Sequence, residues 1–413
     1  MGKLKGDLSL LDAVNIALGS IIGAGIFVII GSAAGQAGPA IVLSIIIAAA
    51  VAAMTGFSTA ELSKRYPKSG GAYTFAKETI SDDAGFIVGW VWLFSNIATG
   101  ATVALGFGHY LAFFLPSIPI GLAAAGLVLA VTAVNLLGAK QSSTINNILV
   151  LIKLSVLIFF VLSAAQYFKT KNFEPFMPFG INGVLAGAAT IFFAYSGFAR
   201  VAVMADEIHE PKKNVPRATM ISIGASTLIY ALVAVSAVGL AGYAALSESG
   251  SPLSDAMNAN GMGFGATLVG VGALVATSTV ALASILGLSR IAHTMSSNGD
   301  LPALLAKTDK SGAVPTIAVI LSGTAMLAFV FLTDLPNIAF ISSFSLLLYY
   351  AAINLSGMKS LDGSGKAASA LGLIACIILM VSLPILSWLV GAAVILVGFA
   401  YYIFSARGKK AMQ

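Results

Sequence analysis

The chain has 413 residues, of which 58% are hydrophobic and only 9% are charged, and its formal net charge is +6. A soluble domain carries about 25% charged residues, so the composition excludes a soluble protein and predicts one embedded in a membrane. The single cysteine, Cys376, excludes an intrachain disulfide and a cysteine-based metal cluster.

Apolar stretches of about 20 residues recur along the whole chain, and each can cross a hydrocarbon core about 30 Å thick. They lack the short alternating pattern of a membrane β-barrel. We therefore predict an all-α membrane protein with 12 transmembrane helices in a single transmembrane domain, 1–413. The predicted spans are 8–34, 39–62, 84–114, 118–138, 143–166, 183–205, 216–243, 264–296, 313–333, 336–356, 368–384 and 386–404.

The polar connections indicate how the spans are oriented. One long apolar stretch is divided at Pro384, which predicts a tight turn between the last two spans. Most lysines and arginines lie in the termini and in the connections that share one side of the membrane, whereas Lys169 and Lys171 lie on the other side. Cytoplasmic loops collect basic residues, so we expect a multi-pass protein of the cell membrane with both termini cytoplasmic. The segment 244–262 is expected to be a surface loop on the outer side, with room for a short helix.

The first span contains "GSIIGAGIF", residues 19–27, with glycines at three of its first seven positions. Each glycine costs about 0.5–1 kcal/mol in a helix interior, so the pattern predicts an interruption. Backbone groups freed inside a membrane are tolerated only where they line a cavity. Freed N–H groups bind anions such as a carboxylate, and freed carbonyl groups bind cations such as an ammonium. Close helix packing through small residues is the alternative interpretation.

The sixth span raises the same question with "FFAYSGFAR", residues 192–200, where Ser196 and Gly197 lie in mid-span. Two interrupted helices five spans apart predict two five-helix repeats, about 8–166 and 183–356, followed by two additional helices, about 368–404. Inverted repeats of this kind build many secondary transporters, whose sites form where the broken helices meet.

Five motifs in this order resemble those of the amino acid–polyamine–organocation (APC) transporter superfamily. They are "GSIIGAGIF", "YPKSGGAY", "FFAYSGF", "EIHEPKKNVPRA" and "SRIAHTMSSNGDLP". The resemblance implies a LeuT-like 5+5 inverted repeat with discontinuous helices 1 and 6, and secondary transport by alternating access.

The resemblance also implies a substrate site at the two interruptions. Its members would be the N–H groups of Gly23, Ala24 and Gly25 and the carbonyl groups of Ile21, Phe193 and Ser196. Phe193 resembles the aromatic gate that closes over bound substrate. Gly197, in the same motif, is also a predicted member of the site. Tyr195 is either a second wall of the site or an ordinary packing aromatic.

Lys153 lies ten residues inside the fifth span. Burying a charged lysine there costs about 2.5–3.5 kcal/mol, and about 15 Å separates it from the helix end, beyond the reach of snorkelling. Its position resembles that of proton-coupled prokaryotic members, in which the ammonium takes the place of a sodium ion. That resemblance implies contacts with Gly19 and with Ser278 or Thr279, and a proton as coupling ion, with no cofactor or bound metal.

Arg200 follows the sixth-span motif and departs from the family pattern. It could pair with Asp12 as an inner gate, contact an acidic or carboxamide side chain of the substrate, form a structural ion pair, or face a water-filled vestibule.

The function expected from these observations is import of neutral L-amino acids with protons, because the pocket motifs contain no clear acidic group. An amino acid exchanger, or a carrier of cationic amino acids or polyamines on the same fold, is the alternative. A divalent-metal carrier would need carboxylate, imidazole or thioether ligands at the interruptions, and the motifs lack them. A retinal-type receptor, an enzyme and a nucleic-acid partner are not expected, and the oligomeric state is left open.

Overall fold

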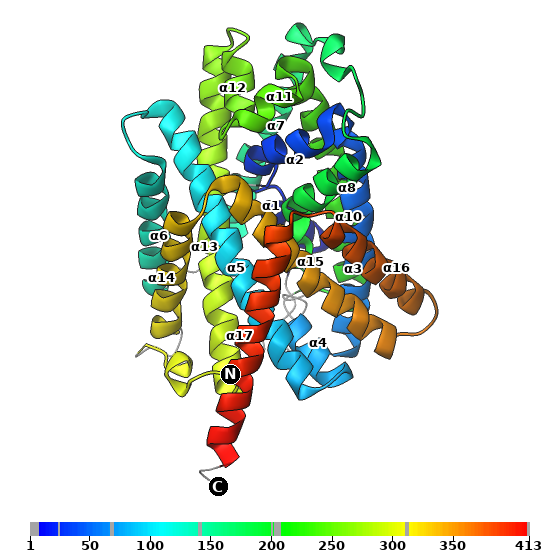
Figure 1. Ribbon diagram of the computed structural model, residues 1–413, viewed down its shortest axis with the longest axis vertical. Helices are drawn as coiled ribbons and strands as arrows, with labels where there is room; N and C mark the ends of the chain where they lie inside the picture. Colours follow the sequence, from blue (N-terminus) through cyan, green and yellow to red (C-terminus); the bar gives the residue numbers. More distant parts are fainter. Residues whose placement is uncertain are drawn as a thin grey trace.

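The structure is a computed structural model that describes residues 8–23, 25–66, 70–138, 143–199, 201, 208–309 and 314–410. Its described residues form an elongated bundle of helices (Figure 1), with one isolated bridge between Leu8 and Ile208. In the first half the chain builds α1 (Leu10–Ile21), a π-helical turn (Gly25–Ile29), α2 (Ile30–Ala37), α3 (Ile41–Arg65), α4 (Ala72–Thr79), α5 (Asp82–Phe114), α6 (Ile120–Leu136) and α7 (Ser143–Ala164).

The second half begins with α8 and a 3-10 helix and then returns repeatedly across the bundle. Its elements are α8 (Gly180–Ile191), the 3-10 helix Phe192–Ala199, α10 (Pro211–Ala241), α11 (Tyr243–Glu248), α12 (Pro252–Asn258), α13 (Gly263–Ser297), α14 (Thr316–Leu332), α15 (Leu335–Ser360), α16 (Gly363–Val381) and α17 (Ile385–Lys410).

The predicted spans coincide with these helices. Among the described residues, 9 stretches are long and apolar enough to cross a membrane, and one of them, Leu10–Arg65, covers the first two predicted spans. Two shorter apolar helices, Ile120–Leu136 and Thr316–Leu332, match the predicted spans 118–138 and 313–333. The all-α membrane fold class is therefore confirmed, and the turn predicted at Pro384 separates α16 from α17.

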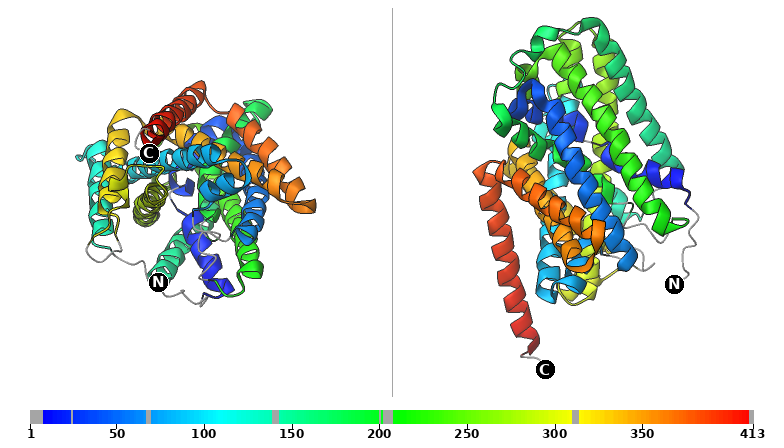
Figure 2. Two further views of the ribbon diagram at one scale, coloured as in Figure 1. Left: turned by 90° about the horizontal axis from the view of Figure 1, so that it is seen from below. Right: turned by 90° about the vertical axis from the view of Figure 1, so that its right-hand side faces the viewer.

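Long helices form the centre of the bundle. The helices α5 and α13 pack along each other, and α6 and α14 lie side by side on one flank (Figures 1 and 2). The last helix, α17, packs against α5 and α15 from outside, where the Trp90 ring nitrogen donates to the Val394 carbonyl at 3.0 Å. Within the membrane, buried Asn354 on α15 donates to Thr55 at 2.9 Å and lies 3.8 Å from the Cys376 sulfur.

The expectation of a surface loop at 244–262 is wrong in part. The segment forms two short helices, α11 and α12, whose Leu246, Leu253 and Met257 are buried. A Cβ at Gly31 of α2 would lie 2.4 Å from the Leu246 carbonyl oxygen, so α11 packs tightly onto α2. Regularly spaced apolar side chains thus fold this connection onto the end of the bundle.

The connection before α5 contains α4 and a polar cluster that joins α4 to the end of α13. The Tyr73 hydroxyl donates to Asp300 at 2.6 Å, and Asn298 donates to Tyr73 at 2.9 Å. Lys77 pairs with Asp300 at 3.6 Å and with Asp82 at 3.5 Å. Two motifs recognised in the sequence, "YPKSGGAY" and "SRIAHTMSSNGDLP", therefore meet at this cluster.

Replacing Asp300 with Asn is expected to lower the melting temperature by a few degrees, because Tyr73 and Lys77 lose a carboxylate that is only 12% exposed. Burial and the Asp300 hydrogen bond raise the pKa of Tyr73. Burial alone would lower the pKa of Lys77, but the charge of Asp300 makes the net shift upward. Both shifts favour the protonated form in the folded state, so this stability is present below pH 10.0 and is lost as pH rises through the raised values.

Thermal unfolding of the wild type and of the Asp300→Asn protein between neutral and alkaline pH tests this expectation. Glu248→Gln on α11 removes one exposed carboxylate at the other end of the bundle and serves as the control. Equal melting temperatures for the Asp300→Asn protein and the control would show that the cluster contributes nothing measurable.

Candidate functional site

The interruption predicted in the first span is present. Helix α1 ends at Ile21, and the Gly23 N–H turns back to the Ile21 carbonyl at 2.8 Å. A π-helical turn, Gly25–Ile29, then leads into α2. In an uninterrupted helix Gly23 would instead donate to the carbonyl of Gly19. The interruption therefore frees the Gly19 carbonyl for another donor. Ala24, a predicted member of the site, lies outside the described residues.

The second interruption takes a different form from the first. Helix α8 ends at Ile191 and continues as a 3-10 helix, Phe192–Ala199, which contains Ser196 and Gly197. A 3-10 helix is narrower and bonds poorly compared with an α-helix, so the chain departs from α-helical geometry here without becoming extended. Arg200, which follows this segment, lies outside the described residues.

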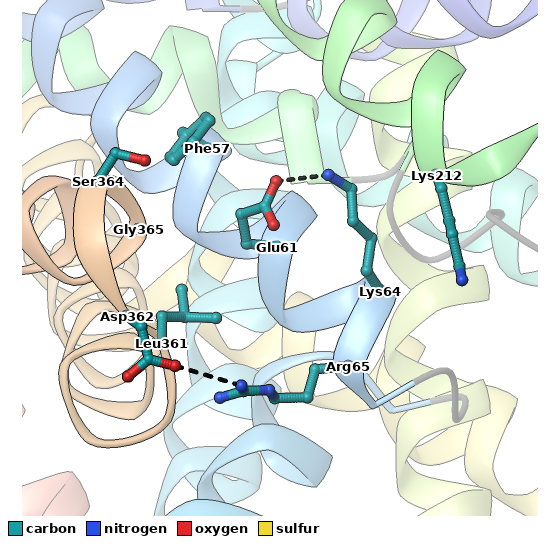
Figure 3. A pocket seen from close by; sticks show the side chains of 9 residues that line it. All are labelled: Phe57, Glu61, Lys64, Arg65, Lys212, Leu361, Asp362, Ser364 and Gly365. Carbon is teal, nitrogen blue, oxygen red and sulfur yellow. Dashed lines mark hydrogen bonds and ion pairs between the residues drawn. The ribbon is translucent and has the colours of Figure 1, made fainter.

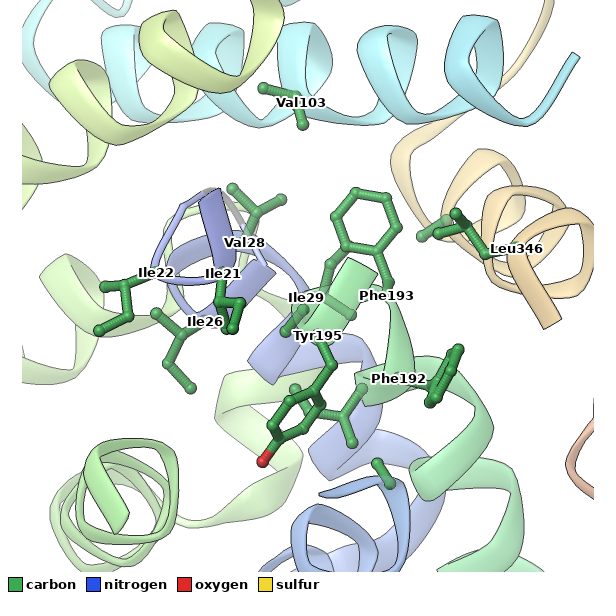
Figure 4. Packing of buried hydrophobic residues seen from close by; sticks show 14 of the residues in the cluster. Ile21, Ile22, Ile26, Val28, Ile29, Val103, Phe192, Phe193, Tyr195 and Leu346 are labelled. Atoms are coloured by element: carbon green, nitrogen blue, oxygen red, sulfur yellow. The ribbon is translucent and has the colours of Figure 1, made fainter. Parts of the chain in front are cut away.

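The two interruptions lie directly against each other (Figure 4). A Cβ on Gly25 would lie 2.4 Å from the Ala194 Cα, and one on Gly197 would lie 2.3 Å from the backbone of Ser20. A Cβ on Gly23 would lie 2.4 Å from Val280 of α13. Gly25 and Gly197 therefore allow the two backbones to touch, and close packing is part of the reason for the glycine pattern.

Three buried tyrosines from surrounding helices donate to carbonyl groups of the interruptions. Tyr230 of α10 donates to Ile21 at 2.6 Å and to Ala194 at 3.2 Å, so one hydroxyl bonds both interruptions. The other two bonds run from Tyr350 of α15 to Ser196 at 2.7 Å and from Tyr110 of α5 to Phe27 at 2.7 Å.

A carbonyl oxygen has two lone pairs. At Ile21 both are used, by Tyr230 and by the Gly23 N–H, so a cation bound to this carbonyl would take the place of one of these donors. Sequence reasoning missed all three tyrosines. Their only signal was a phenol inside an otherwise apolar span, as in "LIYALV" and "LLYYAAI". A buried hydroxyl in a membrane span needs a partner, and this requirement could have singled them out.

The two aromatic candidates of the sixth span point in opposite directions (Figure 4). Phe193, only 3% exposed, points toward Val103 of α5 and Leu346 of α15. Tyr195 points away, and its hydroxyl donates to Thr227 of α10 at 3.1 Å. Only Phe193 therefore faces the side of the interruptions where α5 and α15 lie.

Lys153 is 2% exposed, and its ammonium donates to the Gly19 carbonyl at 3.3 Å. The predicted contact with Gly19 is therefore confirmed, and it is made to the carbonyl that the interruption frees. A Cβ on Gly19 would lie 2.6 Å from Val150, so α1 packs closely on α7 at this point. Thr279 donates to Ala276 within α13 at 2.8 Å, and Ser278, beside it, is partly exposed.

Asp12, the predicted partner of Arg200, caps its own helix. Ser9 donates to the Asp12 carboxylate through its N–H at 3.0 Å and through its hydroxyl at 2.6 Å, and the Asp12 N–H donates back to Ser9 at 3.2 Å. This capping box fixes the start of α1. The structure thus gives Asp12 a role that needs no arginine.

Replacing Tyr230 with Phe is expected to reduce transport by about tenfold or more, because it removes the hydroxyl that links the Ile21 and Ala194 carbonyl groups, and each lost hydrogen bond costs about 0.5–1.5 kcal/mol. The measurement is initial uptake rate in proteoliposomes at matched protein density. Tyr195→Phe is the matched control, because Thr227 keeps its bond to Ile223 at 2.7 Å. Equal rates for both variants would mean that the Tyr230 hydroxyl does not hold the interruptions together.

Comparison with known proteins gives a consistent result over the whole chain. The family profile described as amino acid permease matches residues 12–412. An uncharacterized transporter of Mycobacterium tuberculosis is 35% identical over 97% of this chain and 91% of its own length. The methylthioribose transporter of Bacillus subtilis is 31% identical, covering 98% of this chain and 94% of the relative. The branched-chain amino acid permease of the same organism is 30% identical, covering 100% and 95%.

Proposed function

Because the chain belongs to the amino acid permease family of the APC superfamily, we propose that it imports neutral L-amino acids together with protons by alternating access. The protein would lie in the cell membrane with both termini cytoplasmic. The observation that carries the proposal is the meeting of two interrupted helices beside a buried lysine.

The amino acid backbone is a zwitterion, and the interruptions offer groups for both of its charges. The carbonyl group of Ser196 already accepts a hydroxyl donor, and an α-ammonium would use its remaining lone pair. At Ile21, which accepts from both Tyr230 and the Gly23 N–H, the ammonium would take the place of one donor. The N–H groups of Gly23, Ala24 and Gly25 would bind the carboxylate, as at a helix N-terminus, with Gly23 releasing its hydrogen bond to Ile21 as the substrate binds.

A neutral side chain is supported by the surroundings of the interruptions. Phe193, Val103 and Leu346 are apolar, and the tyrosine hydroxyls are uncharged. A second positive charge on the substrate would need a carboxylate to balance it. The name of the branched-chain amino acid permease agrees with an apolar side chain, whereas the methylthioribose transporter points to a different small molecule.

Proton coupling is supported by the bond between Lys153 and Gly19. The carbonyl of Gly19 is free only while the first helix is interrupted, so the ammonium stabilises the interrupted form. A neutral lysine amine would hold α1 less strongly, because hydrogen bonds from a charged donor are roughly twice as strong. Loss of the proton would thus loosen α1 from α7 and favour opening on one side.

Uptake of a panel of labelled amino acids into proteoliposomes, with and without an inward proton gradient, tests the proposal. We expect a neutral amino acid with an apolar side chain to accumulate only when the gradient is present. Uptake that needs amino acid inside the vesicle and ignores the gradient would identify an exchanger. Uptake of methylthioribose or of arginine alone would overturn the neutral amino acid as substrate.

A further inference from the structure

We propose that a groove at the basic end of the bundle binds the phosphodiester headgroup of an anionic membrane lipid. The groove is a pocket of about 480 Å³ between the end of α3, the start of α10 and the connection from α15 to α16 (Figure 3). The residues that carry the argument are Phe57, Glu61, Lys64, Arg65, Lys212 and Asp362.

The groove lies on the part of the bundle that faces lipid. Helix α3 packs against both α10 and α16, and the three run side by side across one face of the bundle (Figure 2, right). Above the groove, α10 exposes Ile221 at 49% and Leu228 at 64%, and α16 exposes Leu371 at 59% and Ile374 at 55%. Exposed aliphatic side chains in a membrane protein contact acyl chains, so a lipid beside this face reaches the groove directly.

The charges in the groove favour an anion. Its three cations face two carboxylates: Lys64 pairs with Glu61, and Arg65 pairs with Asp362 at 3.4 Å. Lys212 has no carboxylate partner among the residues that the structure describes. The Asp362 side chain is 89% exposed and that of Arg65 is 48% exposed. Ion pairs that are so exposed to solvent contribute little to stability, so a phosphate can take the place of Asp362 at small cost.

The order of residues along α3 matches a lipid better than a free anion. Phe57, Glu61 and Lys64 are spaced four and three residues apart and therefore lie on one face of the helix. From Phe57 to Lys64 the helix rises about 10 Å, from the apolar interior to the basic end. This arrangement places an apolar contact for the glycerol region above cations for the phosphate. Inorganic phosphate would use only the lower half of the groove.

The location of the groove is typical of sites for acidic headgroups. Basic pockets between transmembrane helices on the cytoplasmic side bind anionic lipids. None of the residues that line the groove belongs to the two interruptions, and Lys153 is not among them, so the lipid site does not depend on which substrate is carried.

Thermal unfolding of the purified full-length protein in detergent tests the proposal. We expect phosphatidylglycerol to raise the melting temperature by about 2–4 °C, whereas phosphatidylcholine and inorganic phosphate at equal concentration do not. The double variant Arg65→Gln with Lys212→Gln should lose the shift. The single variant Lys212→Gln should need more phosphatidylglycerol for half of its effect, and its matched control, Lys171→Gln at the opposite end, should respond as the wild type does.

A variant that strengthens the site keeps the test decisive if the double variant folds poorly. Asp362→Asn removes the carboxylate that competes for Arg65, so less phosphatidylglycerol should be needed for half of the shift. An unchanged response in both Asp362→Asn and Lys212→Gln would overturn the site. An equal shift with inorganic phosphate would overturn the lipid as its occupant and leave a soluble anion.

Discussion

Lys153→Gln is expected to abolish proton-driven accumulation of substrate while exchange of amino acid across the membrane persists. Glutamine keeps a donor near the Gly19 carbonyl, which Lys153 meets at 3.3 Å, but it carries no proton that can be released. The measurement is uptake into proteoliposomes with an imposed proton gradient, followed by counterflow with unlabelled amino acid inside. A loss of at least about tenfold in accumulation corresponds to 1.4 kcal/mol or more of lost coupling.

Lys169→Gln provides the control for a removed charge, because this exposed lysine lies between the fifth and sixth spans and its ammonium donates to Asn260 at 3.3 Å. It should leave accumulation unchanged. If Lys153→Gln accumulates substrate as the wild type does, the lysine is structural and the coupling proposal fails. If both accumulation and counterflow vanish, Lys153 acts on the whole cycle, and coupling must be assigned elsewhere.

Gly197→Ala is expected to reduce transport more than about tenfold, because its new methyl group would lie 2.3 Å from the backbone of Ser20. Backbone cannot move aside as the end of a flexible side chain can, and overpacking costs about 1–3 kcal/mol or more. The two interruptions would be held apart, so the arrangement with Gly25 against Ala194 could not form. Initial uptake rate and melting temperature, measured together, separate a transport defect from a folding defect.

Gly224→Ala is the matched control for this substitution. It lies in α10, and a Cβ there meets nothing within 4 Å, so the change should be neutral or slightly stabilising through better helix propensity. If Gly197→Ala transports as well as Gly224→Ala does, the close approach of the interruptions has no part in the cycle.

Local features of the sequence predicted the spans and the first interruption well. The length and apolarity of each stretch located the helices that cross the membrane. Pro384 marked the turn before α17, because proline cannot continue a helix. The glycines of "GSIIGAGIF" marked the end of α1 at Ile21. The depth of Lys153 in its span, together with the family resemblance, also predicted the contact with Gly19.

Contacts between distant parts of the chain were harder to predict. Nothing local indicates that Tyr230 reaches both Ile21 and Ala194, or that Tyr73 pairs with Asp300. These bonds depend on how helices far apart in sequence cross. For Asp12, sequence reasoning missed a local contact, the capping box with Ser9, whereas its pairing with Arg200 stays a prediction.

The buried position of Cys376 makes the chain a convenient template for spectroscopy. It is the only cysteine, it is 0% exposed, and Asn354 lies against its sulfur. Thiol-reactive dyes or spin labels should therefore react with cysteines introduced at the surface and leave the native one untouched. Label pairs attached to the ends of α1 and α13 would report their separation in single molecules, without first removing a native thiol.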